Sequence, residues 1–147
     1  MITITKSREV SSPIESVWDM LTNSDSEQKY WPALKNIKIL SRKGNTIERE
    51  ATVSRGPVGN AKSLQTLVVD PKKSIALTMT KGPMLGTRKI TLSPLGEGRV
   101  RIDVMWQFEV KGIPGFAQGF VEDNISEGTD RALSAIAKEA EAIRPGK

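Results

Sequence analysis

The stretch GIPGFAQGFVEDNISEGTDRALSAIAKEAEAI, residues 112–143, decides the fold because it predicts one long helix. Pro114 and Gly115 mark its start, and Pro145–Gly146 marks its end. Between them, small and apolar residues recur at spacings of three and four, the period of one helix face. About 28 residues at roughly 1.5 Å each form a rod of about 40 Å, so this helix must lie against another layer. The predicted stripe contains Phe116, Phe120, Asn124, Gly128, Ala132, Ile136, Ala140 and Ile143.

The two halves of this stripe differ in composition. The second half carries Ala, Leu and Ile, which is typical of close packing, whereas the first half carries two Phe, an Asn and a Gly. We therefore interpret the first half as the wall of a space and Gly128 as a residue that keeps volume free beneath the helix. The alternative, that the whole stripe is packed core, stays open at this point.

The rest of the chain predicts a meandering antiparallel sheet with two short helices after its first strand. Residues 2–10 form the first strand. The capping box from Ser24 to Glu27 begins the second short helix, which ends before Trp31–Pro32. From Leu34 onward, apolar and polar residues alternate, and Gly-rich or Pro-containing turns separate the alternating runs. With residues 2–10, these runs give seven strands, the others lying at 36–42, 46–55, 60–70, 73–81, 86–94 and 98–110. We expect one α+β domain over residues 1–147, with the long helix covering the apolar face of the sheet.

Composition excludes several kinds of chemistry. The chain has no histidine and no cysteine, so a His general base, a thiolate nucleophile and the common zinc sites are impossible. The absence of cysteine fits a reducing cytoplasm, which is the expected location. The net charge is +5, but the basic residues are scattered among acidic ones and aromatic residues make up only 5%. We expect a solvated basic surface and no nucleic-acid partner.

Local details point to a known family. A strand is followed by Ser12-Pro13-Ile14-Glu15-Ser16-Val17-Trp18, then by Trp31–Pro32 after a second helix and by Asp70–Pro71 before a strand. In this order, the chain resembles the START/Bet v 1-like (SRPBCC) superfamily, especially its polyketide cyclase/dehydrase and lipid-transport branch. The resemblance implies a helix-grip fold: a curved antiparallel sheet wrapped around the C-terminal helix, with an apolar cavity between them. It also implies binding of a lipid-like, isoprenoid or aromatic molecule.

Two arginines stand out because the alternation places them on the apolar face. Arg49 shares a phase with Ile47 and Ala51, and Arg88 with Ile90. A guanidinium facing a core is costly unless it is paired. Either these side chains reach the rim, or they meet a carboxylate or phosphate of a ligand. The candidate ligand-binding residues are therefore Trp31, Arg49, Met79, Arg88, Trp106, Phe108, Phe116, Phe120 and Asn124.

The leading functional hypothesis is a binding or carrier protein for a small hydrophobic ligand. A His-independent cyclase or dehydratase and a protein-interaction module of the chaperone-cofactor kind are the alternatives. The sequence supports no catalytic residue, and we expect neither a metal nor another cofactor. Met84 and Leu85 lie in a predicted hairpin tip and suggest at most a transient membrane contact.

Overall fold

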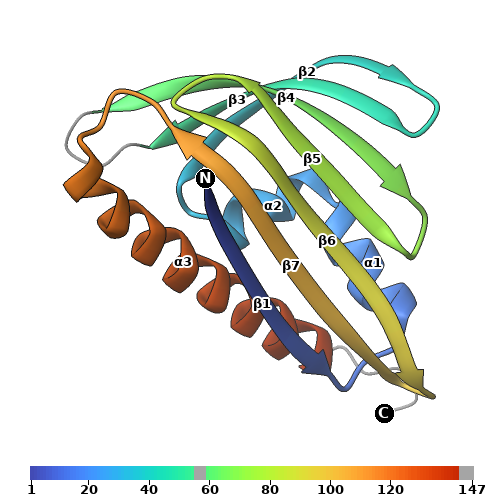
Figure 1. The fold of residues 1–147 in the computed structure, drawn as a ribbon. Helices are drawn as coiled ribbons and strands as arrows, with labels where there is room; N and C mark the ends of the chain where they lie inside the picture. The colour runs from blue at the N-terminus through green and yellow to red at the C-terminus, as the bar shows by residue number, and fades with distance from the viewer. Residues whose placement is uncertain (55–58, 143–147) are drawn as a thin grey trace.

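The computed structural model describes residues 1–54 and 59–142 and contains one sheet and three helices within these ranges (Figure 1). The predicted order of elements is confirmed. The elements are β1 (Ile2–Val10), α1 (Ile14–Thr22), α2 (Ser24–Tyr30), β2 (Leu34–Lys43), β3 (Thr46–Ser54), β4 (Asn60–Asp70), β5 (Ser74–Lys81), β6 (Met84–Gly96), β7 (Arg99–Val110) and α3 (Gly115–Ala142).

The seven strands form a curved antiparallel sheet in the order β1-β7-β6-β5-β4-β3-β2. Strands β2 to β7 follow one another as a meander, and β1 pairs with β7. The predicted alternation is confirmed on β7, where Val100, Ile102 and Val104 are fully buried while Arg101 and Glu109 are exposed. One face of the sheet therefore carries the core. The long helix lies along this sheet beside β1, which is the helix-grip arrangement (Figure 1).

The second half of α3 packs as predicted, but the first half does not. Ala132, Ile136 and Ala140 are fully buried. Phe116 and Phe120, in contrast, are 89% and 70% exposed. The expectation that these two rings line a space under the helix is therefore wrong. Ile143, the last residue of the predicted stripe, lies outside the described residues.

The geometry of the helix explains this error. Residues four apart are offset by about 40°, so a row of such residues drifts around the helix. Phe116 and Ala132 consequently lie about 160° apart and cannot share a face. Val121 lies within about 20° of the direction of Ala132. The buried residues form two core clusters, one with Val100, Ile102 and Ile136 and a second with Met79 and Phe108. Val121 and Ile125 accordingly pack against the second core cluster.

The hairpin between β5 and β6 is shorter than predicted. Met84 already belongs to β6 and pairs with Val110 of β7, so Met84 and Leu85 are half-buried strand residues rather than a tip in water. Met84 packs against the same core cluster as Val110.

The two edges of the sheet are β1 and β2. Strand β2 contains two register shifts, near Leu34 and near Ile39. It also carries exposed basic residues, namely Lys35, Lys38, Arg42 and Lys43. No helix of the described residues is long and apolar enough to span a bilayer.

Candidate ligand-binding cavity

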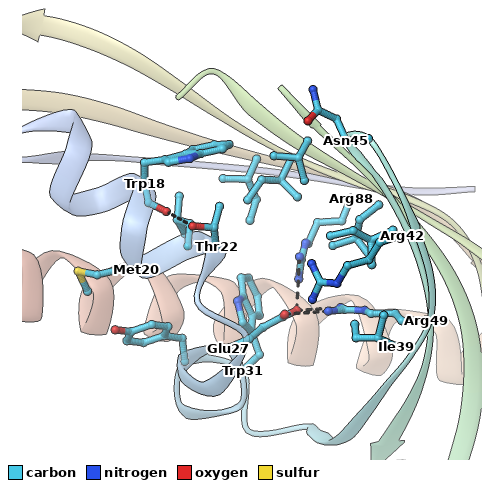
Figure 2. A pocket seen from close by; sticks show the side chains of 18 residues that line it. Trp18, Met20, Thr22, Glu27, Trp31, Ile39, Arg42, Asn45, Arg49 and Arg88 are labelled. Atoms are coloured by element: carbon cyan, nitrogen blue, oxygen red, sulfur yellow. Dashed lines mark hydrogen bonds and ion pairs between the residues drawn. The ribbon is translucent and has the colours of Figure 1, made fainter. Parts of the chain in front are cut away.

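A cavity of about 350 Å³ lies between the sheet and the two short helices (Figure 2). Its described lining residues come from α1, α2, strands β2 to β6, Trp31 and the turn between β2 and β3, and none of them comes from α3. The predicted position, between the sheet and the C-terminal helix, is therefore wrong. The reason is that the buried side chains of α3, such as Ala132 and Ile136, share a core cluster with Ile102 and Val104 of β7 and so fill that space. Aliphatic lining residues include Leu21, Ile39, Ile47, Leu67, Ile75 and Ile90.

Arg49 projects into this cavity from β3 and is held by a carboxylate of α2. Its Nη1 and Nη2 donate to Oε1 and Oε2 of Glu27, both at 2.8 Å. Its Nε donates to Oε1 of Gln65 at 2.8 Å, and the amide nitrogen of Gln65 donates to Oγ of Ser63 at 3.2 Å. The side chain is only 4% exposed. Each of the three nitrogens of Arg49 therefore has a hydrogen-bond partner within the chain itself.

Arg88 projects from β6 toward the same carboxylate but is poorly paired. Its Nη2 lies 4.0 Å from Oε2 of Glu27, and its Nε has no hydrogen-bond partner although the residue is only 7% exposed. Its guanidinium carbon lies 4.9 Å from the ring centre of Trp31 and 5.6 Å from that of Trp106. Burial lowers the pKa of Arg88 to about 10, even though Glu27 opposes this shift. The arginine is thus stabilised by two indole faces and by one distant carboxylate.

Glu27 connects α2 to the sheet. Burial would raise its pKa, but the hydrogen bonds and charge of Arg49, together with the charge of Arg88, outweigh burial and lower the pKa below 4.5. The carboxylate is therefore ionised at neutral pH. The sequence assigned this residue to a capping box, but the structure directs both of its oxygens to Arg49.

The structure brings only some of the predicted site residues together. Trp31, Arg49 and Arg88 line the cavity, and Trp106 contacts Arg88 from outside the lining. The sequence left two explanations for an inward arginine: a position at the rim, or a contact with an anionic ligand. Neither explains Arg49, because this buried side chain pairs with Glu27 of the chain itself.

The other predicted residues lie elsewhere. Met79 and Phe108 are buried in the second core cluster and do not line the cavity. Phe116, Phe120 and Asn124 are exposed on α3, so their assignment to the cavity wall is corrected. Gly128 also lies away from the lining, and a methyl group added there would meet nothing within 4 Å.

Sequence reasoning missed most of the lining, including Trp18, Glu27, Tyr30 and Arg42. One signal could have found Glu27. Two arginines on the apolar face demand a counter-charge, and the short helix that covers them contains this glutamate in its middle. Tyr30 is buried at the end of the same helix, and burial raises its pKa to about 12. Within the described ranges, no three His, Cys, Asp or Glu side chains gather as a metal ion would require.

Residues 1–141 match the family model described as polyketide cyclase / dehydrase and lipid transport. The chain therefore belongs to this family, as the resemblance of its sequence implied. No curated protein matches the chain.

Solved structures with the same fold include proteins of different kinds. The Zhui aromatase/cyclase from Streptomyces superposes with a TM-score of 0.81 at 15% identity, over 95% of this chain and 93% of that one. A START superfamily protein from Mycobacterium smegmatis gives 0.77 at 17% identity, over 93% and 97%. A protein from Thermus thermophilus gives 0.80 at 15% identity, over 96% and 98%. At these identities, the likeness shows the fold alone.

Proposed function

We propose that this protein binds a small hydrophobic molecule in the cavity between the sheet and the α1–α2 pair. The observation that carries the proposal is the cavity itself. Its volume of about 350 Å³ lies at the lower end of the range of about 300–1,000 Å³ that is typical of small-molecule sites. Aliphatic side chains from five strands and the indoles of Trp18 and Trp31 form much of its wall. Such a volume suits a compact molecule of one or two rings, or a short chain.

Two further features support binding rather than the alternatives. Glu27 is ionised and shared between two arginines, so it is a poor proton donor at neutral pH, which disfavours an acid-catalysed dehydration at this carboxylate. An interaction module of the chaperone-cofactor kind would favour a groove filled by its own side chains, and an open cavity does not suit it. The cytoplasmic location is part of this proposal and is supported by the absence of cysteine.

The proposal is tested with N-phenyl-1-naphthylamine, an uncharged dye that emits strongly in apolar surroundings. The purified protein is titrated with the dye and compared with two variants on the same strand. Ile39→Trp places a large ring in the cavity lining, whereas Leu40→Trp places the same ring on the neighbouring exposed residue outside the lining.

We expect saturable dye binding to the unmodified protein and to Leu40→Trp, and at least tenfold weaker binding to Ile39→Trp. Native mass spectrometry of the freshly purified protein provides a second readout of a retained molecule. Absence of dye binding, or equal binding by both variants, would refute the proposed cavity. Turnover of an aromatic polyketide-like substrate would instead favour the enzyme alternative.

A further inference from the structure

The charges around the cavity do not balance. Of the described residues that line it, four are charged: Glu27, Arg42, Arg49 and Arg88. Arg42 is exposed on β2, and Figure 2 shows its side chain reaching toward the other three from the sheet. The remaining three form a buried group with two positive charges and one negative charge. A buried charge without a counter-charge is costly, and it attracts an ion of opposite sign.

The excess charge is located on Arg88 rather than shared equally. Arg49 takes both oxygens of Glu27 at 2.8 Å, whereas Arg88 lies 4.0 Å from the nearest of them. The Nε of Arg88 is buried and makes no hydrogen bond. A guanidinium has five N–H donors, and a carboxylate can accept two of them side by side. Arg88 therefore retains more donor capacity than Arg49, which already uses three of its five N–H groups.

From this arrangement we infer that Arg88 is the recognition site for one monoanionic group, of the carboxylate type, carried by a hydrophobic ligand in the cavity. This inference rests on the proposed function and adds the chemical class of the ligand. Trp31 and Trp106 flank the guanidinium at 4.9 and 5.6 Å, so they fix its position without using its donors. Arg42 lies at the exposed side of the cavity and attracts the same sign of charge.

Glu27 sets the limit on the charge of this group. One additional negative charge neutralises the three buried groups, whereas a second would leave them negative. Arg42 is exposed, so solvent and salt screen its charge and it compensates a second negative charge only weakly. A phosphate monoester carries nearly two negative charges above pH 7. Its second charge would face the carboxylate of Glu27, which is held only 4.0 Å from Arg88. The site is therefore expected to prefer a carboxylate to a phosphate monoester of similar size.

The test uses three probes with the same two-ring body. These are 2-naphthoate, the uncharged 2-naphthamide and 2-naphthyl phosphate, each measured at pH 8 by displacement of N-phenyl-1-naphthylamine. The unmodified protein is compared with Arg88→Met, Arg88→Lys and the matched control Arg99→Met. Arg99 is an exposed arginine of β7 that pairs with Glu9, away from the lining. Circular dichroism establishes that each variant is folded.

We expect naphthoate to bind the unmodified protein at least tenfold more tightly than naphthamide, the ratio typical of a hydrogen bond to a charged group. Naphthyl phosphate should bind more weakly than naphthoate. Arg88→Met should reduce the ratio of acid to amide to about twofold or less and still bind the uncharged dye, whereas Arg99→Met should retain the full ratio. Arg88→Lys should retain part of it, because a lysine keeps the charge but loses the planar donor pair.

Equal binding of acid and amide by the unmodified protein would overturn this inference and leave the proposed function intact. This comparison needs no variant, so it decides the matter even if Arg88→Met does not fold. A full acid-to-amide ratio in Arg88→Met would overturn the assignment to Arg88, and tighter binding of the phosphate would overturn the preference for a monoanion. Failure of the uncharged dye to bind would contradict the cavity proposal itself and would remove this inference with it.

Discussion

Glu27→Gln is the most informative single change, because it removes the one negative charge among the buried arginines. The side chains of Glu27 and Arg49 are 12% and 4% exposed, so solvent screens their interaction weakly. Removing one partner of such a pair leaves an uncompensated buried charge and costs about 3–5 kcal/mol. In Glu27→Gln, two guanidiniums face each other with an amide between them, so we expect destabilisation within this range.

Arg49→Met should cost less, about 2 kcal/mol, because Glu27 then still has Arg88 within reach of a small movement. The double variant removes both partners. Its destabilisation should fall short of the sum of the single effects by about 2 kcal/mol, which is the coupling expected for residues in one ion-pair network.

The assay is urea denaturation at pH 7, followed by tryptophan emission, for all four corners of this double-mutant cycle. The slope of the unfolding free energy against urea should not change, since the surface exposed on unfolding is nearly the same. The melting temperature of Glu27→Gln should fall by about 6–20 °C. Single effects that add to within about 0.5 kcal/mol, or a cost below about 1 kcal/mol for Glu27→Gln, would refute the assignment of a buried, coupled pair.

Other predictions concern particular positions. The folded pKa of Glu27 is below 4.5, so the stabilisation from its ionised carboxylate is fully present above pH 4.5 and is lost as the pH falls through the folded pKa. The difference in unfolding free energy between the unmodified protein and Glu27→Gln should therefore narrow in this acidic range. A constant difference would contradict the lowered pKa. Gly86→Ala should destabilise by more than about 2 kcal/mol in thermal melts, because Gly86 has φ +149° and a Cβ there would lie 2.1 Å from the carbonyl oxygen of Gln107. Gly128→Ala should instead raise the unfolding free energy by up to about 1 kcal/mol and leave dye binding unchanged. Weaker dye binding by this variant would indicate that Gly128 belongs to the ligand site after all. Phe120→Ser should change stability by less than about 0.5 kcal/mol and leave dye binding unchanged, because the ring is 70% exposed.

The strands could be predicted from the sequence because a period of two is unambiguous over ten residues. From Leu34 onward the residues alternate except near Ile39–Leu40 and Leu67–Val69, and each turn carries its own Gly or Pro signal. The order of elements and the inward phase of Arg49 and Arg88 could therefore be predicted. A single polar residue within an apolar run is informative, since the pleat leaves only two directions for a side chain.

The position of the site could not be predicted, for two physical reasons. A helix allows any direction around its axis, so the row from Phe116 to Gly128 seemed continuous with the buried residues although it drifts away from them. The second reason is that Glu27 acts at long range: it lies 22 residues from Arg49 in the chain, and no local pattern joins them. Its sequence neighbours suggested a helix cap, whereas its partner is set by how α2 packs on the sheet.

The open edge of the sheet affects how the protein behaves in concentrated solution. An edge strand exposes unpaired N–H and C=O groups, which can recruit a strand from a second molecule. Two features of β2 oppose such pairing. Its register shifts interrupt the regular row of backbone hydrogen-bonding groups, and its lysines repel the like charges of a second copy. Charge repulsion weakens as salt is added, so at high ionic strength only the irregular register of β2 still opposes pairing with a second molecule. Acetylation of Lys38, two residues before the exposed Leu40 on the same strand, would therefore favour aggregation without altering the folded monomer.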